Sequence, residues 1–262
     1  MTLRQSLDRL YREFDFRARI DSDPIKFPKK YKEKKDIEVS GLIASAFAYG
    51  RVELFLPVIE KILSAMGKNP HEFLINYNEK RDSKIFAGIS YRFQKENDIK
   101  RLISILSDVL RRYGTIENLF YFFYSPEDRN IKNALEGMQK ELKLIRLFPL
   151  PSTGSACKRA NLFLRWMIRD KDIDFGIWRG IGKSKLIIPL DTHIARVSNC
   201  LGLTKRKTPS WAMAEEITDS LKRFDPDDPL RYDFSLCHSG IMGLCNKMRC
   251  SDCKLNSQRK NL

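Results

Sequence analysis

Long apolar runs are missing from this chain. No stretch reaches the roughly eighteen consecutive apolar residues that suggest a membrane-spanning helix. The N-terminal MTLRQSLDRLYREFDFR is charged and amphipathic, unlike the apolar core of a secretory signal. We therefore expect a cytoplasmic protein with no membrane partner.

Signs of β-structure are also scarce. Alternation between apolar and polar residues never lasts long, and Asn-Gly and Asp-Gly dipeptides, which favour tight hairpins, are absent. Leu3, Leu7, Leu10 and Phe14 instead recur at helical spacing. Repeats and low-complexity stretches are lacking too, and hydrophobic residues make up 42% of the chain, enough for a folded core. The sequence predicts an all-α globular protein.

Glycine, proline and capping residues punctuate the expected helices. Pro57 either kinks the second of them or marks its true first turn, and Ser125-Pro126-Glu127-Asp128 is typical of a helix start. A weak break lies at 170–185, where polar residues and glycines interrupt the pattern. The main helices are expected at 37–50, 52–67, 98–114, 157–169, 192–200, 210–224 and 230–242.

Positive charge is in excess, with 48 Lys and Arg against 33 Asp and Glu and a net charge of +15. Such a balance favours a polyanionic partner, of which nucleic acid is the commonest. Clusters at 26–35 and 205–207 support that interpretation. The alternatives are a generally basic surface and an anionic membrane surface, although no flanking amphipathic anchor supports the latter.

Cysteines are unevenly placed: Cys237, Cys245, Cys250 and Cys253 all follow residue 236. Disulfides are rare in cytoplasmic proteins, so we do not expect these cysteines to form them. The C-x4-C-x2-C spacing with Cys237 fits an iron–sulfur cluster, and a zinc site that also uses His238 is a second option. The third option is a decayed cluster that leaves free thiols.

Two stretches carry candidate chemistry. In LPSTGSACKRANLFLRWM, at 150–167, a glycine turn leads into a helix whose N-terminal N–H groups could approach a phosphate. Lys158 near that positive end would be pushed towards its neutral, nucleophilic form. A simple phosphate contact is the rival role. In PLDTHIARV, Asp191 follows an apolar run and is either only a helix cap or a catalytic carboxylate.

Together these stretches resemble the helix-hairpin-helix DNA glycosylase superfamily, most of all endonuclease III, and a bacterial branch of it. The hairpin motif of that superfamily matches residues 154–158, and its D-T-H segment matches 191–193. The likeness is clear over 150–255 and weaker over 37–120, where LIASAFAYG stands in place of the helix that carries the DNA-intercalating residue. Three departures are Ala156 in place of the second hairpin glycine, extra residues around DKDIDFGIWRG, and Arg259 in place of a fourth cluster cysteine.

The resemblance implies a specific reaction. A damaged nucleotide is flipped out of the duplex, and neutral Lys158 attacks the deoxyribose C1′, expels the base and forms a Schiff base. Strand cleavage by β-elimination can follow. The Asp191 carboxylate stabilises oxocarbenium character at the sugar, and no cofactor is required for this chemistry. The residues expected to contact DNA are Gly154, Ser155, Ala156, Arg159, Lys205, Arg206 and Lys207.

The resemblance also implies a two-lobe, all-α architecture with a DNA cleft between the lobes. One lobe is a helical barrel over 36–183 that includes the hairpin, and the other joins 1–35 to 184–262 with its Cys-rich loop. We expect a monomer that binds double-stranded DNA and acts as a repair glycosylase with an abasic-site lyase step. The alternatives are a non-catalytic helix-hairpin-helix nucleic-acid-binding module and a metal-cluster protein acting on RNA or protein partners.

Overall fold

The computed structural model describes residues 2–144 and 146–243, and within them the regular secondary structure is helical. The only β pairing in this part of the chain is an isolated bridge between Tyr91 and Gln94, so the expected all-α class is confirmed there. None of the described helices is long and apolar enough to cross a membrane. The α-helices are α1 (Leu3–Glu13), α2 (Lys34–Phe47), α3 (Val52–Met66), α4 (Pro70–Ile75), α5 (Glu79–Asp82), α6 (Glu96–Tyr113), α7 (Ile116–Phe123), α8 (Lys132–Leu142), α9 (Lys158–Ile168), α10 (Thr192–Leu201), α11 (Trp211–Lys222) and α12 (Asp233–Ile241).

Short 3-10 turns join many of these helices. They lie at η1 (Arg17–Ser22), η2 (Pro24–Lys26), η3 (Pro28–Lys30), η4 (Ser83–Phe86), η5 (Pro151–Thr153), η6 (Lys183–Lys185) and η7 (Pro229–Tyr232). Four of the seven begin with proline, whose fixed φ suits a first helical position.

The chain divides into two compact units. Unit 1 comprises Met1–Ala18 and Pro151–Leu262, and unit 2 comprises Arg19–Leu150. These boundaries differ from the expected lobes, which placed 150–183 with the barrel and 19–35 with the other lobe. The weak break at 170–185 is therefore internal to unit 1.

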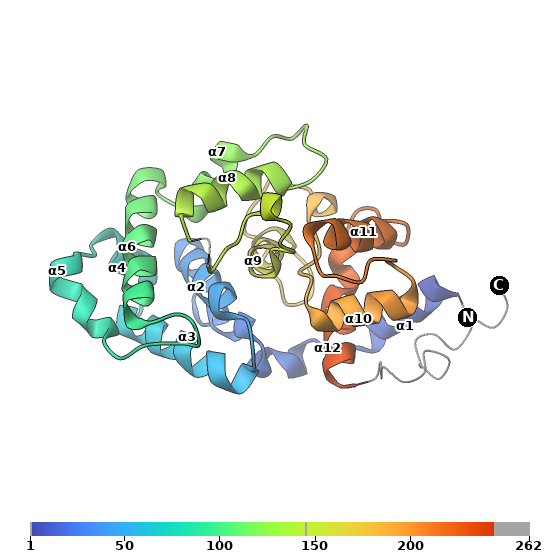
Figure 1. Cartoon of the computed structure of the whole chain (residues 1–262), viewed down its shortest axis with the longest axis horizontal. Coiled ribbons are helices and arrows are strands. Elements are labelled where there is room, and N and C mark those ends of the chain that lie inside the picture. The colour runs from blue at the N-terminus through green and yellow to red at the C-terminus, as the bar shows by residue number, and fades with distance from the viewer. Residues whose placement is uncertain (1, 145, 244–262) are drawn as a thin grey trace. The chain divides into compact units, whose positions relative to one another are not determined.

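Hydrogen bonds back to α9 explain why that break is not a boundary. The N–H of Phe175 donates to the carbonyl of Trp166, and that of Trp178 donates to Met167, both at 2.9 Å. The glycines and polar residues of this stretch thus form a loop that packs on α9. In the same unit, α10 packs against α12, and Figure 1 shows the two helices side by side.

In unit 2, α2 is the core helix. Its residues from Asp36 to Phe47 are all buried, and α3, α4 and α7 pack against it. A helix that is buried all round needs few polar side chains, or polar side chains that are satisfied. Glu38 meets that condition, because its carboxylate accepts from the N–H groups of Ile116 at 3.0 Å and Glu117 at 3.4 Å and so caps α7.

The structure decides between the two positions considered for Pro57 and corrects one predicted helix start. Pro57 lies inside α3 rather than in its first turn. The helix start expected at Ser125 is wrong, because α8 begins only at Lys132. Ser125 instead closes a turn, in which its carbonyl accepts from the N–H of Asp128 at 3.2 Å, and Asn130 then accepts from the N–H of Lys132 at 2.9 Å.

Candidate active site

The hairpin that precedes α9 depends on the backbone of Gly154. Its φ is +81°, in the left-handed region, and its N–H donates to the carbonyl of Pro151 at 3.0 Å. A Cβ atom added at Gly154 would meet nothing within 4 Å, so conformation and not crowding favours glycine here. The Gly154 carbonyl accepts from the N–H of Trp211 at 3.2 Å, which ties the hairpin to the start of α11.

A second left-handed residue, Cys157, completes the turn, with φ of 49°. Its N–H donates to the Ser155 hydroxyl at 3.2 Å, and the Asn161 amide donates to the Ala156 carbonyl at 3.2 Å. Left-handed non-glycine residues cost about 1–3 kcal/mol and cluster at functional sites. The turn sets Lys158 as the first residue of α9.

Asp191 is both a helix cap and an ion-pair partner, and it uses a different oxygen for each. Its Oδ1 accepts from the N–H groups of His193 and Ile194, both at 2.9 Å, at the start of α10. Its Oδ2 lies 3.2 Å from the Lys158 Nζ and accepts from the Cys237 thiol at 3.6 Å. Lys158 and Asp191 were expected in different lobes, but both lie within unit 1 and contact each other directly.

The ion pair remains accessible from one side. The Lys158 side chain keeps 33% of its exposure and the Asp191 side chain keeps 14%. Lys158 can therefore meet a ligand while Asp191 stays fixed behind it by its cap hydrogen bonds.

Burial alone would raise the pKa of Asp191, but the Lys158 ammonium and the Ile194 N–H outweigh it, so the pKa lies below its ordinary value. Asp233 behaves in the opposite way. Burial raises its pKa to about 6, Arg165 opposes the rise, and the charge of Asp191 adds to it. Unit 1 thus holds two mutually sensitive carboxyl groups whose pKa values are displaced in opposite directions.

A buried ion-pair network supports α9 near this site. Arg165 pairs with Asp174 at 3.3 Å and with Asp233. Arg169 pairs with Asp174 at 3.0 Å and with Asp228 at 2.9 Å. This network was not predicted from the sequence. Its only signal was the i, i+4 spacing of Arg165 and Arg169 in the apolar second half of the helix expected at 157–169, since a charge among apolar residues requires a partner.

The other residues expected to contact DNA lie on the surface of unit 1. Gly154, Lys205, Arg206 and Lys207 are exposed, and Ser155, Ala156 and Arg159 are partly exposed. Arg206 pairs with Glu216 at 3.0 Å, and the Lys205 N–H donates to the same carboxylate at 2.9 Å. Part of this basic cluster is therefore held by an acidic side chain of α11.

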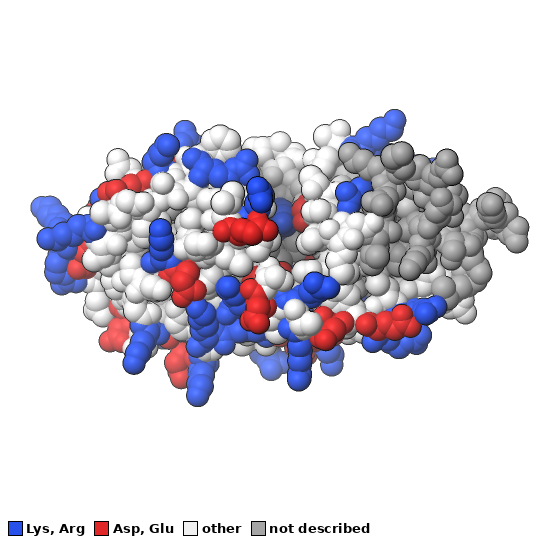
Figure 2. All heavy atoms as spheres, turned by 90° about the horizontal axis from the view of Figure 1, so that it is seen from below, with Lys and Arg blue, Asp and Glu red and all other residues white. Residues whose placement is uncertain are grey.

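Surface charge of both signs is intermixed. Figure 2 shows lysine and arginine side chains spread over one face of the described residues, with aspartate and glutamate among them. The net positive charge is thus not gathered into one patch on this face. Any polyanion site has to be argued from particular side chains.

The cysteine ligand set falls largely outside the described residues, because Cys245, Cys250 and Cys253 follow residue 243. Within the part described, Cys237 contacts Asp191, and the His238 ring packs on Phe234 with centroids 4.3 Å apart. The described residues contain no group of three or more His, Cys, Asp or Glu side chains that could hold a metal ion.

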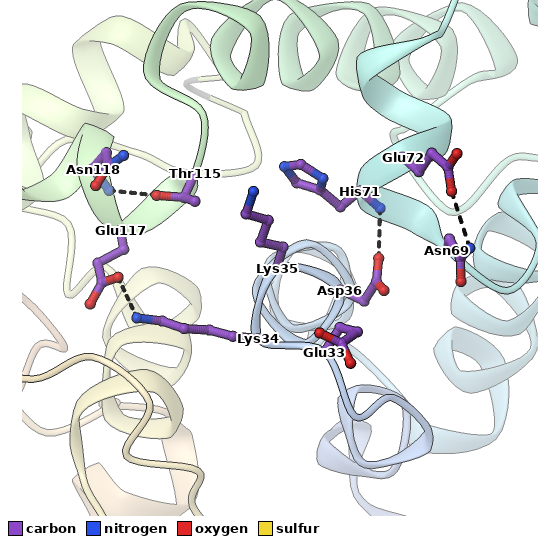
Figure 3. Close-up of a pocket in the computed structure, with 10 residues that line it drawn as sticks. All are labelled: Glu33, Lys34, Lys35, Asp36, Asn69, His71, Glu72, Thr115, Glu117 and Asn118. Atoms are coloured by element: carbon purple, nitrogen blue, oxygen red, sulfur yellow. Dashed lines mark hydrogen bonds and ion pairs between the residues drawn. The ribbon is translucent and has the colours of Figure 1, made fainter.

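Unit 2 has a hollow of about 540 Å³ between the starts of α2, α4 and α7. Figure 3 shows Lys35 reaching into it and the Lys34–Glu117 pair at its side. Asp36 accepts from the N–H of His71 at 2.9 Å. Four acidic and two lysine side chains line this hollow, so it lacks the excess of positive charge that an anionic ligand needs.

Comparison with protein families gives one result that covers most of the chain. The chain belongs to the family described as "Protein of unknown function (DUF2400)", whose model matches residues 23–242. That span includes Lys158, Asp191 and both sides of the buried network. Neither the curated proteins nor the solved structures gave a match.

Proposed function

We propose that this protein is a DNA repair glycosylase, with an abasic-site lyase step, that removes a damaged base through Lys158 and Asp191. The observation that carries the proposal is the accessible contact of 3.2 Å between the two side chains at the end of a glycine hairpin. The likeness of the hairpin and of the D-T-H segment to the helix-hairpin-helix DNA glycosylases supplies the reaction class.

The lowered pKa of Asp191 favours one role for it over another. A carboxylate that resists protonation is a weak general base but a lasting negative charge. We therefore assign Asp191 to stabilising the positive charge that grows on the sugar as the glycosidic bond breaks. Its cap hydrogen bonds hold that charge in place before the substrate arrives.

Lys158 acts after losing its proton to solvent or to the departing base. Its Nζ forms a bond to the deoxyribose C1′ while the bond from C1′ to the base breaks, and the base leaves with the electron pair and takes up a proton. The nitrogen then loses a proton, and its lone pair forms the C=N bond of an iminium ion as the C1′–O4′ bond breaks and O4′ takes up a proton. Loss of a C2′ proton then breaks the C3′–oxygen bond, and water hydrolyses the iminium and restores the lysine.

The alternative is a helix-hairpin-helix binding module in which Lys158 stays charged and contacts a phosphate. The ion pair itself favours that role, because a nearby carboxylate stabilises the ammonium form of an amine. The two functions differ in one outcome: only a glycosylase or lyase forms a covalent bond to the sugar.

The test is borohydride trapping with the full chain and a panel of duplexes that each carry one damaged base or one abasic site. We expect a trapped protein–DNA adduct with wild type and none with Lys158→Gln. Lys183→Gln is the matched control, since Lys183 also pairs with an aspartate of unit 1, Asp170, at 2.8 Å. Duplex binding without trapping or base release on every lesion would favour the binding module.

A further inference from the structure

A second hollow in unit 2 has a basic lining. It measures about 470 Å³ and lies between the start of α6 and the end of α8. This volume is within the range of about 300–1,000 Å³ that is usual for small-ligand sites. The lining consists of Gln94, Asp98, Arg101, Lys143, Leu144, Arg146 and Leu147.

Charge in this hollow is unbalanced. Three cationic side chains face one carboxylate, and that carboxylate, Asp98, already accepts from the N–H of Lys95 at 2.8 Å. Arg101 and Lys143 are exposed and form no ion pair or hydrogen bond through their side chains with any described residue. The hollow thus offers at least two uncommitted cationic groups to an anion.

The polar side chain of Gln94 adds an independent sign of a ligand. The residue is only 4% exposed, lines the hollow, and makes no side-chain hydrogen bond within the described part of the chain. The Gln94 amide is not among the fully enclosed side-chain atoms that lack a partner, so it opens to the hollow and its N–H groups can donate to a ligand there. An amide N–H pair beside guanidinium and ammonium groups suits the oxygens of a phosphate.

The backbone fixes this arrangement. Lys143 ends α8 in the left-handed conformation, with φ of 52°, a strained choice for a residue other than glycine or asparagine. Gln94 is fixed by two hydrogen bonds with the backbone of Tyr91, at 2.9 and 2.8 Å. The backbone at both residues is therefore fixed before any ligand binds.

The turn beside Gln94 indicates what carries the phosphate. Phe93, at its tip, is 73% exposed, and the Arg92 guanidinium lies over its ring at 5.8 Å from the centroid. Phe93 does not itself line the hollow but directly precedes Gln94, which does. Exposed aromatic rings together with cationic groups are what single-stranded nucleic acid uses, with the base on the ring and the backbone on the cations.

We propose that Gln94, Arg101 and Lys143, with Arg146 beside them, bind one phosphate group of a nucleic-acid strand, and that Phe93 stacks on an unpaired base of that strand. The phosphate site consists of residues of unit 2 and does not involve Lys158. The assignment of that phosphate to a nucleic-acid strand rests on the proposed function.

The experiment measures binding of a fluorescent single-stranded oligonucleotide by the full chain over a range of salt concentrations, and binding of inorganic phosphate by calorimetry. The variants are Gln94→Leu, Arg101→Met and Lys143→Asn, the last chosen because asparagine tolerates the left-handed conformation. Lys140→Met is the control, because Lys140 is a cation of α8 that pairs with Glu136 and does not line the hollow.

We expect each pocket variant, but not the control, to weaken binding of both probes. Because one phosphate is shared, Arg101→Met and Lys143→Asn together should reduce the slope of log affinity against log salt by about 0.7 in total for a single strand, not twice that. Phe93→Leu should weaken oligonucleotide binding by roughly 5- to 100-fold and leave phosphate binding unchanged.

The outcomes separate the two sources of the phosphate. If the pocket variants affect only inorganic phosphate, the phosphate site stands and the nucleic-acid strand is wrong. If Gln94→Leu and the double variant, both folded by circular dichroism, bind both probes like wild type, the site is refuted. Neither result depends on trapping at Lys158, so failure here is distinguishable from failure of the proposed reaction.

Discussion

Unit 1 keeps opposite charges together in two regions that differ in their access to water. In the buried network, the side chains of Arg165, Asp174 and Asp233 keep 4%, 1% and 3% of their exposure. In the hairpin pair, Lys158 keeps 33% and Asp191 keeps 14%. These three side chains satisfy their charges internally and are closed to a ligand, whereas the hairpin pair presents its cation to solvent. Ion pairs between the same types of group thus stabilise the fold in one region and leave a cation open to a ligand in the other.

The largest effect should come from changing the hairpin carboxylate without disturbing its cap. Asparagine caps helices about as well as aspartate, so Asp191→Asn should keep the bonds from His193 and Ile194 and remove only the charge. On a lesion identified by trapping, we expect single-turnover base release to fall by about 10²–10³-fold. Asp170→Asn is the control, and an unchanged rate in Asp191→Asn would reduce Asp191 to a cap.

A substitution in the buried network should lower the free energy of unfolding. Arg165→Met leaves Asp233 without its cation and Asp174 with one cation fewer, and breaking a buried pair in this way costs about 3–5 kcal/mol. Lys158→Met, at the accessible pair, should cost about 1 kcal/mol or less. Urea unfolding of both variants measures the contrast. Equal losses would mean that the two regions do not differ in the way their exposure suggests.

The hairpin should be sensitive to backbone conformation and not to packing. Gly154→Ala forces a left-handed alanine and should cost about 1–2 kcal/mol, although no neighbour obstructs the added Cβ. Gly154→Asn should cost less, because asparagine enters this conformation more readily. Thermal unfolding of the pair gives the order, and an equal loss in both variants would indicate a steric cause instead.

The smallest effect concerns pH. The pKa of Asp233 is raised to about 6 in the folded protein, above the value near 3.9 of an unfolded chain. The folded state therefore binds a proton on Asp233 more tightly than the unfolded chain does. As the pH falls from 7.5 to 5, this proton binding should raise the free energy of unfolding by about 1 kcal/mol. The pKa of Asp191 is lowered, so its effect on stability has the opposite sign: its contribution to the free energy of unfolding is lost only below about pH 4.

Urea unfolding of wild type and Asp233→Asn at pH 7.5 and pH 5 isolates the Asp233 contribution. The advantage of wild type over the variant should be larger at the lower pH. A difference between the two proteins that does not change with pH would show that Asp233 keeps an ordinary pKa.

Local signals in the sequence account for the positions of several helices. The helix expected at 157–169 is α9, one residue shorter at each end, and the helix expected at 192–200 is α10, one residue longer. The resemblance to a known reaction singled out Lys158 and Asp191, but it assigned them to different lobes, whereas they form an ion pair within unit 1. Whether the whole chain has the glycosylase architecture stays a prediction.

Long-range pairing could not be derived in the same way. Arg165 and Asp233 are 68 residues apart and Arg169 and Asp228 are 59 apart, and nothing local selects one carboxylate of this chain over another. The helix start at Ser125 failed for a related reason, since a cap and a proline favour a first turn but cannot ensure that packing continues it. The basic hollow likewise joins Gln94, which precedes α6, to Lys143, which follows α8.

The most direct test of the central claim is to locate the covalent bond. Wild-type protein is reduced with borohydride on the duplex that traps best, digested, and analysed by tandem mass spectrometry. The account predicts a sugar remnant on the Nζ of Lys158 and no other modified lysine. A remnant on a different lysine, with Lys158 recovered unmodified, would contradict it.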